Sequence, residues 1–128
     1  MKSRSIIVKG TEVSITSRHE QDYISLTDMV KRFGDESILY NWLRNRNTIE
    51  FLGIWEQLYN PVFKPLEFER FRNQAGLNRF SLSPKKWIEA TGAIGIYAKS
   101  GRNGGTYAHK DIAFEFGSWL SPEFKLYL

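Results

Sequence analysis

The sequence predicts a small α+β domain in which helices pack on short antiparallel strands. Short runs rich in β-branched residues occur near the N-terminus and again around residues 93–108, and turn residues bound them. Elsewhere apolar residues recur at spacings of three and four, which is typical of amphipathic helices. The chain has 128 residues, of which 41% are hydrophobic and 15% aromatic. That is enough for one domain with a real core.

The first elements are strands followed by a capped helix. Residues 6–8 and 13–15, on either side of a turn at Gly10, predict a hairpin or two edge strands, and residues 23–24 predict a third short strand. Ser25 with an acidic residue three positions later is typical of a capping box and predicts a helix over 25–34. Its core residues are expected to be Leu26, Met29, Val30 and Phe33.

Two further helices are expected on either side of a polar break at residues 44–47. Asp35 can cap the first, and Asn47 with Glu50 can form a capping box for the second, which ends at Asn60 and Pro61. This arrangement is compatible with a helix-turn-helix, although it is common in helical proteins in general. The expected buried residues are Ile38, Leu39, Trp42 and Leu43 in the first helix and Ile49, Leu52, Trp55 and Leu58 in the second.

The second half of the chain predicts two helices, a hairpin and a final helix. Residues 63–76 can form a short helix that carries Leu66, Phe68 and Phe71 and ends at Gly76, and Ser83 with the following proline is a strong helix start. Residues 93–98 and 106–108 then predict two strands around the turn KSGRNGG at 99–105. A helix over 109–120 follows, and Ser121 restarts one that continues to the last residue. Because the sequence stops inside an apolar helical pattern, we expect a fragment of a longer protein.

The composition excludes several classes of chemistry. Cysteine is absent, which rules out disulfides, a thiol nucleophile and cysteine-based zinc sites. His19 and His109 stand far apart, and the string 123–125, which resembles a nuclease motif, follows a helix start instead of lying on a strand. No run approaches the ~18 apolar residues of a membrane span, and the N-terminus is not a signal peptide. We therefore expect a soluble cytoplasmic protein that is not an enzyme and uses no cofactor and no metal.

The positive charge is regional. The net charge is +4, but between Arg70 and Arg102 seven basic residues face a single acid, Glu89. Such a region is the footprint of a polyanion partner, although lysine and arginine also occur on any solvated surface.

Three segments are candidates for nucleic-acid contact. The first is the tip of the 94–108 hairpin, whose glycines allow close backbone approach. The second is the polar break at 44–47, where a helix start can meet bases and phosphates. The third is a rim of basic residues that includes Arg70 and Arg72. The alternatives are a mobile surface hairpin, plain helix capping and a solvated face. The candidate residues are Arg44, Arg46, Asn47, Lys85, Lys86, Lys99, Ser100, Arg102 and Asn103.

Three blocks of the sequence resemble the KilA-N domain. They are DYISLTDMVKRFG (22–34), NWLRNRNTIEFL (41–52) and NGGTYAHKDIAFEFGSWLSPEFKLYL (103–128), and they occur in the family's order. The resemblance covers about half of the chain directly and spans most of it. The stretch 60–89 departs from the pattern because it is longer and more aromatic.

The resemblance implies a winged-helix-like fold similar to the fungal APSES DNA-binding domain. It implies a single KilA-N-like domain over 1–128 in a phage, viral or bacterial protein, for which we expect a regulatory role in transcription. The hairpin at 94–108 would be a basic wing on double-stranded DNA, with Lys99, Arg102 and Asn103 at its tip. In a bacterium the protein would be associated with the nucleoid.

A rival interpretation is a protein-interaction or oligomerisation module. It is favoured by the high aromatic content, four Trp, nine Phe and six Tyr, and by the apolar C-terminal helix, through which the chain could bind itself or another protein. A metal-dependent nuclease is the least favoured class because the acidic residues are scattered along the chain.

Overall fold

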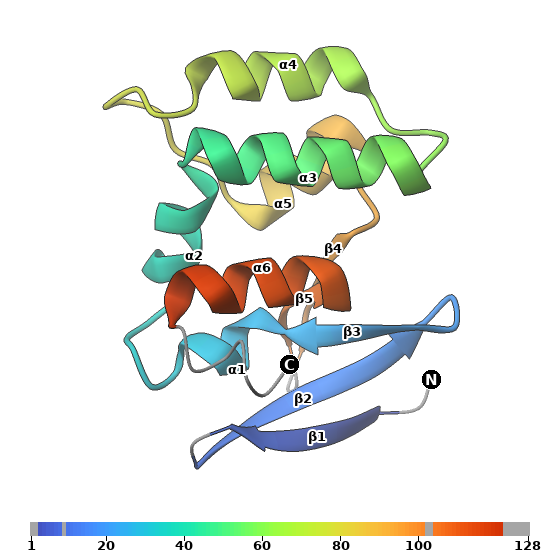
Figure 1. Ribbon diagram of the computed structural model, residues 1–128, viewed down its shortest axis with the longest axis vertical. Coiled ribbons are helices and arrows are strands. Elements are labelled where there is room, and N and C mark those ends of the chain that lie inside the picture. Colours follow the sequence, from blue (N-terminus) through green and yellow to red (C-terminus); the bar gives the residue numbers. More distant parts are fainter. Residues whose placement is uncertain (1–2, 9, 102–103, 122–128) are drawn as a thin grey trace. The chain divides into compact units, whose positions relative to one another are not determined.

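The computed structural model describes residues 3–8, 10–101 and 104–121, and it divides the chain into two compact units. The sheet unit comprises Met1–Glu36 and Ala98–Leu128, and the helical unit comprises Ser37–Tyr97. The helical unit is therefore an insertion in the sequence of the sheet unit. Figure 1 shows the elements of both.

The sheet unit is built on an antiparallel sheet with the strand order β1-β2-β3-β5-β4. β1 pairs with β2 around the turn at Gly10, β2 pairs with β3, and β3 pairs with β5, where Ile24 lies opposite Ala108. The bounds are β1 Ser3–Val8, β2 Thr11–Arg18, β3 Gln21–Ser25, β4 Ile96–Lys99 and β5 Gly105–His109. The predicted N-terminal hairpin and the strand at residues 23–24 are confirmed.

Two helices cover this sheet. They are α1 (Leu26–Val30) and α6 (Lys110–Leu120), which contact each other. α1 also contacts β2 and β5, and α6 contacts β3 and β5. The predicted helix at 25–34 is shorter than expected, and Phe33 is 46% exposed, because α1 ends at Val30 and the chain turns away. The core between helices and sheet consists of Val13, Ile15, Ile24, Leu26, Met29, Val30, Ala108, Ile112, Ala113 and Phe116.

The helical unit consists of four helices around an aromatic core. They are α2 (Ser37–Leu43), α3 (Arg46–Tyr59), α4 (Pro65–Gln74) and α5 (Pro84–Thr91). α3 and α4 approach closely at Gly53, where an added Cβ would lie 2.3 Å from the Phe68 ring. The rings of Phe63, Phe68, Phe71 and Trp87 contact one another at centroid distances of 5.9–6.4 Å.

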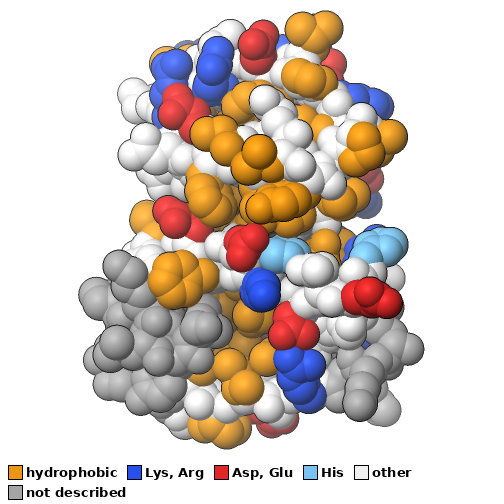
Figure 2. All heavy atoms as spheres, turned by 45° about the vertical axis from the view of Figure 1, so that its right-hand side comes forward, with side chains coloured by type: hydrophobic (Ala, Val, Ile, Leu, Met, Phe, Trp, Pro, Cys, Tyr) orange, Lys and Arg blue, Asp and Glu red, His pale blue; other side chains and the backbone are white. Residues whose placement is uncertain are grey.

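Two local expectations for this unit are wrong. α3 begins at Arg46 after the N-cap Asn45, so Asn47 is not a capping residue. Leu58 is 70% exposed, although it was expected in the core. In α3 the inward position of the last turn belongs to Glu56 instead, because that carboxylate has hydrogen-bond partners elsewhere in the unit. Figure 2 shows that hydrophobic side chains remain on the surface.

The expected α+β class is confirmed by this sheet and its helices. The predicted strand at 93–98 starts later, at Ile96, and the helix predicted from Ser121 to the last residue falls outside the described residues. In the part of the chain that the structure describes, no helix is long and apolar enough to cross a membrane.

Candidate nucleic-acid interface

The helical unit has two distinct ends because α3 and α5 run in the same direction (Figure 1). Where both helices finish, Asn60 Nδ2 donates to the Gly92 carbonyl at 2.9 Å, and the Lys64 amide donates to the Thr91 carbonyl at 2.9 Å. Their starting ends therefore point the same way. The loop after α4 reaches the start of α3, where the Gly76 amide donates to the Arg44 carbonyl at 3.0 Å.

Basic side chains gather at the end where α3 and α5 begin, and we call this the basic end. Arg46 belongs to the first turn of α3, Arg79 to the loop after α4, and Lys85 and Lys86 to the first turn of α5, and all four are exposed. The start of α3 has no side-chain cap, and the dipoles of both helices add partial positive charge to the same end. The basic end therefore offers both cations and backbone donors to an anion.

Arg44 has a different role from the other basic residues of this end. It is half-buried between α2 and α3, and its Nη2 donates to the Asn78 carbonyl at 3.3 Å. With the bond from Gly76 to its own carbonyl, Arg44 holds the loop after α4 against the start of α3. Its main contribution is thus to position the loop that carries Arg79.

The ion pairs at the basic end are weak enough to be exchanged. Arg46 Nε lies 3.1 Å from Glu50 Oε1, and Lys85 Nζ lies 3.9 Å from Glu89 Oε1, with all four side chains well exposed. Exposed pairs of this kind contribute about 0–1 kcal/mol. A phosphate can therefore replace either carboxylate at little cost. The start of α5 is itself fixed, because Ser83 Oγ accepts from the Lys86 amide at 3.1 Å.

The predicted hairpin is present in the strands β4 and β5. Lys99 ends β4 and is exposed, as is Ser100 after it, while Arg102 and Asn103 lie outside the described residues. The end of β4 and the whole of β5 belong to the sheet unit. These four candidates are therefore not placed relative to the basic end of the helical unit.

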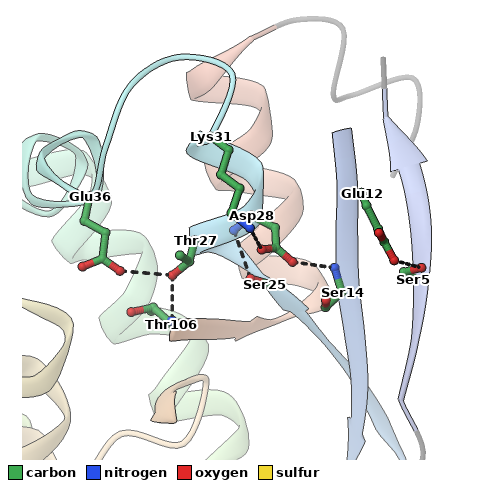
Figure 3. Close-up of polar contacts among 9 residues, drawn as sticks. All are labelled: Ser5, Glu12, Ser14, Ser25, Thr27, Asp28, Lys31, Glu36 and Thr106. Carbon is green, nitrogen blue, oxygen red and sulfur yellow. Dashed lines mark hydrogen bonds and ion pairs between the residues drawn. The ribbon is translucent and has the colours of Figure 1, made fainter. Parts of the chain in front are cut away.

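The base of the hairpin is attached to α1 through Thr27 (Figure 3). Thr27 Oγ1 accepts from the Thr106 amide at 2.9 Å and donates to Glu36 Oε1 at 3.3 Å. Gly105 has a φ of +148°, and a Cβ there would lie 2.7 Å from Thr27 Oγ1. Only glycine fits this approach without displacement. The Ser-Leu-Thr and Gly-Gly-Thr strings, 79 residues apart at the threonines, thus meet at one contact.

Asp28 connects α1 to the sheet on its other side (Figure 3). Its Oδ2 accepts from the Ser14 amide at 2.8 Å, and its Oδ1 pairs with Lys31 Nζ at 2.8 Å. Burial alone would raise the pKa of Asp28, but the hydrogen bonds from Lys31 and Ser14 outweigh it and lower that pKa. Ser25 Oγ accepts from the Asp28 amide at 3.0 Å, which confirms the predicted N-cap.

In the helical unit, a buried carboxylate fixes the segment that leads into β4. Glu56 Oε1 accepts from the Ile94 amide at 3.0 Å and from Asn60 Nδ2 at 2.9 Å, while Oε2 accepts from the Gly95 amide at 2.7 Å. Burial raises the pKa of Glu56, although these three hydrogen bonds act in the opposite direction. The residues just before the hairpin therefore have a defined direction.

The structure thus brings together two of the three predicted segments. Arg44, Arg46 and Asn47 lie at the same end of the helical unit as Lys85 and Lys86, because α3 and α5 both begin there (Figure 1). Arg72, which was expected in the same rim, lies half-buried with its guanidinium 5.8 Å from the Phe68 ring centroid. Arg79 was counted in the basic stretch but not chosen, and the contacts of Arg44 with Gly76 and Asn78 show that its loop belongs to this end.

Within the described residues, no group of three His, Cys, Asp or Glu side chains could hold a metal ion. Comparison with known protein families gives a match to the KilA-N domain over residues 6–128. No curated protein and no solved structure matches the chain significantly.

Proposed function

The chain belongs to the KilA-N domain family, and from this premise we propose that it binds duplex DNA through the basic end of the helical unit and the β4–β5 hairpin. KilA-N domains are generally DNA-binding domains and not an enzyme family. The observation that carries the proposal is the gathering of Arg46, Arg79, Lys85 and Lys86 where two helices begin.

In this proposal the two surfaces have different tasks. The basic end supplies phosphate contacts, for which exposed cations and helix N-termini are suited. The hairpin acts as the wing of a winged-helix-like domain, with Lys99 and Ser100 on phosphates and Arg102 and Asn103 at base edges. Support for the second part comes from the anchoring of β5 to Thr27, which gives the hairpin a fixed base.

The wider biological role is part of the same proposal. Because the family match spans both units, we expect them to work as one DNA-binding module. The module would serve a phage-, virus- or bacteria-associated regulator of transcription, acting in the cytoplasm where its DNA is present. The resemblance of the three sequence blocks supports this role.

Binding of a labelled duplex of about 30 base pairs and mixed sequence, followed by anisotropy across a salt series, tests the proposal. Each phosphate contact contributes a slope of about −0.9 to log K against log salt. The double variant Lys85→Ala/Lys86→Ala should weaken binding and reduce the slope by about one to two. Lys64→Ala is the matched control, because Lys64 is exposed but lies at the opposite end of α3 and α5.

Two results would contradict the proposal. One is the absence of binding by the wild type at about 50 mM salt, where phosphate contacts are strong. The other is an equal loss of DNA affinity per removed charge in the double variant and in Lys64→Ala, which would mean that only net charge matters. Lys99→Ala and Arg102→Ala test the hairpin separately, and wild-type affinity in both would remove it from the interface.

A further inference from the structure

The Thr27 hydroxyl connects three segments of the sheet unit (Figure 3). It accepts from the Thr106 amide at 2.9 Å and donates to Glu36 Oε1 at 3.3 Å. Thr27 belongs to α1, Thr106 belongs to β5 at the base of the hairpin, and Glu36 is the last residue before the helical unit. One hydroxyl group therefore links the hairpin to α1 and to the segment that leads into the helical unit.

The bond from Thr106 to Thr27 continues the sheet where its backbone pairing stops. The pairing of β3 with β5 ends where Ser25 lies opposite Tyr107. The residue after Ser25 is Leu26, which already belongs to α1, so its helical backbone does not continue the pairing. Thr106 is only 7% exposed, and a buried amide needs a hydrogen-bond partner. The Thr27 side chain supplies that partner.

This position requires a hydroxyl group and not only a side chain of the right size. The hydroxyl has one proton, and donating it to Glu36 leaves the lone pairs of the oxygen for the Thr106 amide. Valine has nearly the same shape as threonine but no acceptor. Serine is smaller but can form both bonds. Substitutions at residue 27 can therefore separate hydrogen bonding from packing.

Close backbone packing extends from Thr27 to the basic part of the hairpin. A Cβ added at Gly105 would lie 2.7 Å from Thr27 Oγ1. A Cβ added at Gly104 would lie 2.6 Å from the Lys99 carbonyl oxygen, at the end of β4. Because glycine leaves no side chain between these backbones, a shift of Thr106 away from Thr27 also displaces Lys99, whose side chain is exposed.

We propose that Thr27 is a positioning residue for DNA binding, because its hydroxyl holds the hairpin where Lys99 reaches a phosphate. This inference rests on the proposed function, in which Lys99 contacts the duplex. Thr27 acts through Thr106 and the backbone of residues 104–105 and does not itself contact DNA. Without the hydroxyl, the Thr106 amide loses its partner and the base of the hairpin moves away from α1. An uncharged side chain thus controls a contact made by a charged one.

The salt dependence of duplex binding tests this role, because it counts phosphate contacts. Thr27→Val removes no charge, yet it should reduce the slope of log K against log salt by about 0.9, the contribution of one phosphate contact. The ratio of wild-type to variant affinity should then be about three- to fourfold larger at 50 mM than at 200 mM salt. Thr27→Ser keeps the hydroxyl and should restore the wild-type slope. Circular dichroism confirms folding, and Thr27→Ala replaces Thr27→Val if the latter does not fold.

Two further variants separate positioning from general stability. Thr91→Val is the matched control, because it also removes a hydroxyl bond, from buried Thr91 Oγ1 to the Trp87 carbonyl at 2.6 Å, but in the helical unit. It should leave the salt slope unchanged. Lys99→Ala should reduce the slope by about one in the wild type but much less in Thr27→Val, where the contact of Lys99 is already lost.

The possible outcomes distinguish this role from DNA binding itself. If Lys99→Ala lowers the slope but Thr27→Val does not, the hairpin binds DNA without depending on Thr27, and the proposal is overturned. An equal reduction in Thr27→Ser or Thr91→Val overturns it as well, as does a full effect of Lys99→Ala in the Thr27→Val background. If the wild type binds no duplex, or Lys99→Ala keeps the wild-type slope, the hairpin has no DNA contact to position. In that case the proposed function of the hairpin fails first, and the role of Thr27 fails with it.

Discussion

Substitution of Glu56 tests how the segment before the hairpin is held. Glu56→Gln keeps the size and one oxygen of the side chain, which can still accept from Asn60 and the Ile94 amide, but it leaves the Gly95 amide facing an NH₂ group. A buried donor without a partner costs about 1–3 kcal/mol. Relief from burying a charge offsets part of this cost. We expect Glu56→Gln to lower the free energy of unfolding by about 1–2 kcal/mol.

Glu56→Ala removes all three acceptor contacts and leaves a cavity, so its expected loss is about 3–5 kcal/mol. Urea denaturation followed by tryptophan fluorescence measures both variants. Glu50→Gln is the matched control on the same helix, because its carboxylate is exposed and its pair with Arg46 contributes little. If Glu56→Gln unfolds within about 0.3 kcal/mol of the wild type at neutral pH, the three contacts do not hold this segment and the reasoning is refuted.

The pH dependence of the stability difference between the wild type and Glu56→Gln gives a second check. Burial raises the pKa of Glu56 above 4.5, so between that value and the folded pKa the folded state holds more protons than the unfolded state. Stability from this group therefore falls as the pH rises through that window. The advantage of the wild type over Glu56→Gln should be larger at pH 4 than at pH 7. An advantage that increases with pH would contradict the direction of the shift.

The remaining predictions concern the sheet unit. Gly105→Ala should lower the free energy of unfolding by about 1–3 kcal/mol, because the new Cβ meets Thr27 at a positive φ. Gly76→Ala also has a positive φ but open space around the Cβ, so it should lose less free energy of unfolding in the same urea assay. Equal losses would mean that contact with Thr27 is unimportant. Burial lowers the pKa of His109, so the unfolded state takes up its proton first and stability should fall as the pH drops below about 6.5. Urea midpoints between pH 7.5 and 5 should show a shallower fall in His109→Gln, and an unchanged profile would exclude His109 as the source. The pKa of Asp28 is lowered, so its ionised carboxylate stabilises the folded state above about pH 3.8. This stabilisation is lost as the pH falls through the folded pKa. Thermal unfolding of Asp28→Asn should show a lower Tm at pH 7 and a smaller difference at pH 2–3, and a constant difference would argue against an ionic role.

The sequence predicted the elements whose signals are local. Ser25 and Ser83 cap their helices through the amides three positions later, as the residues at those positions indicated. His109 begins α6 by accepting from the Asp111 amide, at the expected boundary. The α+β class and the positions of the hairpins followed from patterns of this kind.

Features that depend on distant partners could not be predicted. Leu58 was expected inside, but the buried position of that turn belongs to Glu56, and the amides that bond to its carboxylate belong to residues 38 and 39 positions further along. In the candidate site, charge counting identified the basic stretch. Which of its residues lie at the basic end followed only from contacts such as that of Arg44 with Asn78, 34 positions apart. The division into two units could not be predicted from the sequence either, because no linker-like stretch of residues marks the boundaries at 37 and 97.

The insertion of the helical unit has a consequence for how the protein folds. The pairing of β3 with β5 and the bond from Thr106 to Thr27 join residues 79 to 86 positions apart, so they close a loop that contains the whole helical unit. The entropy lost on closing a loop grows with the length of flexible chain inside it. A helical unit that is already compact shortens this flexible length, because its two chain ends are then held at a fixed distance. Assembly of the sheet, and with it the base of the hairpin, is therefore fastest on chains in which residues 37–97 have collapsed first.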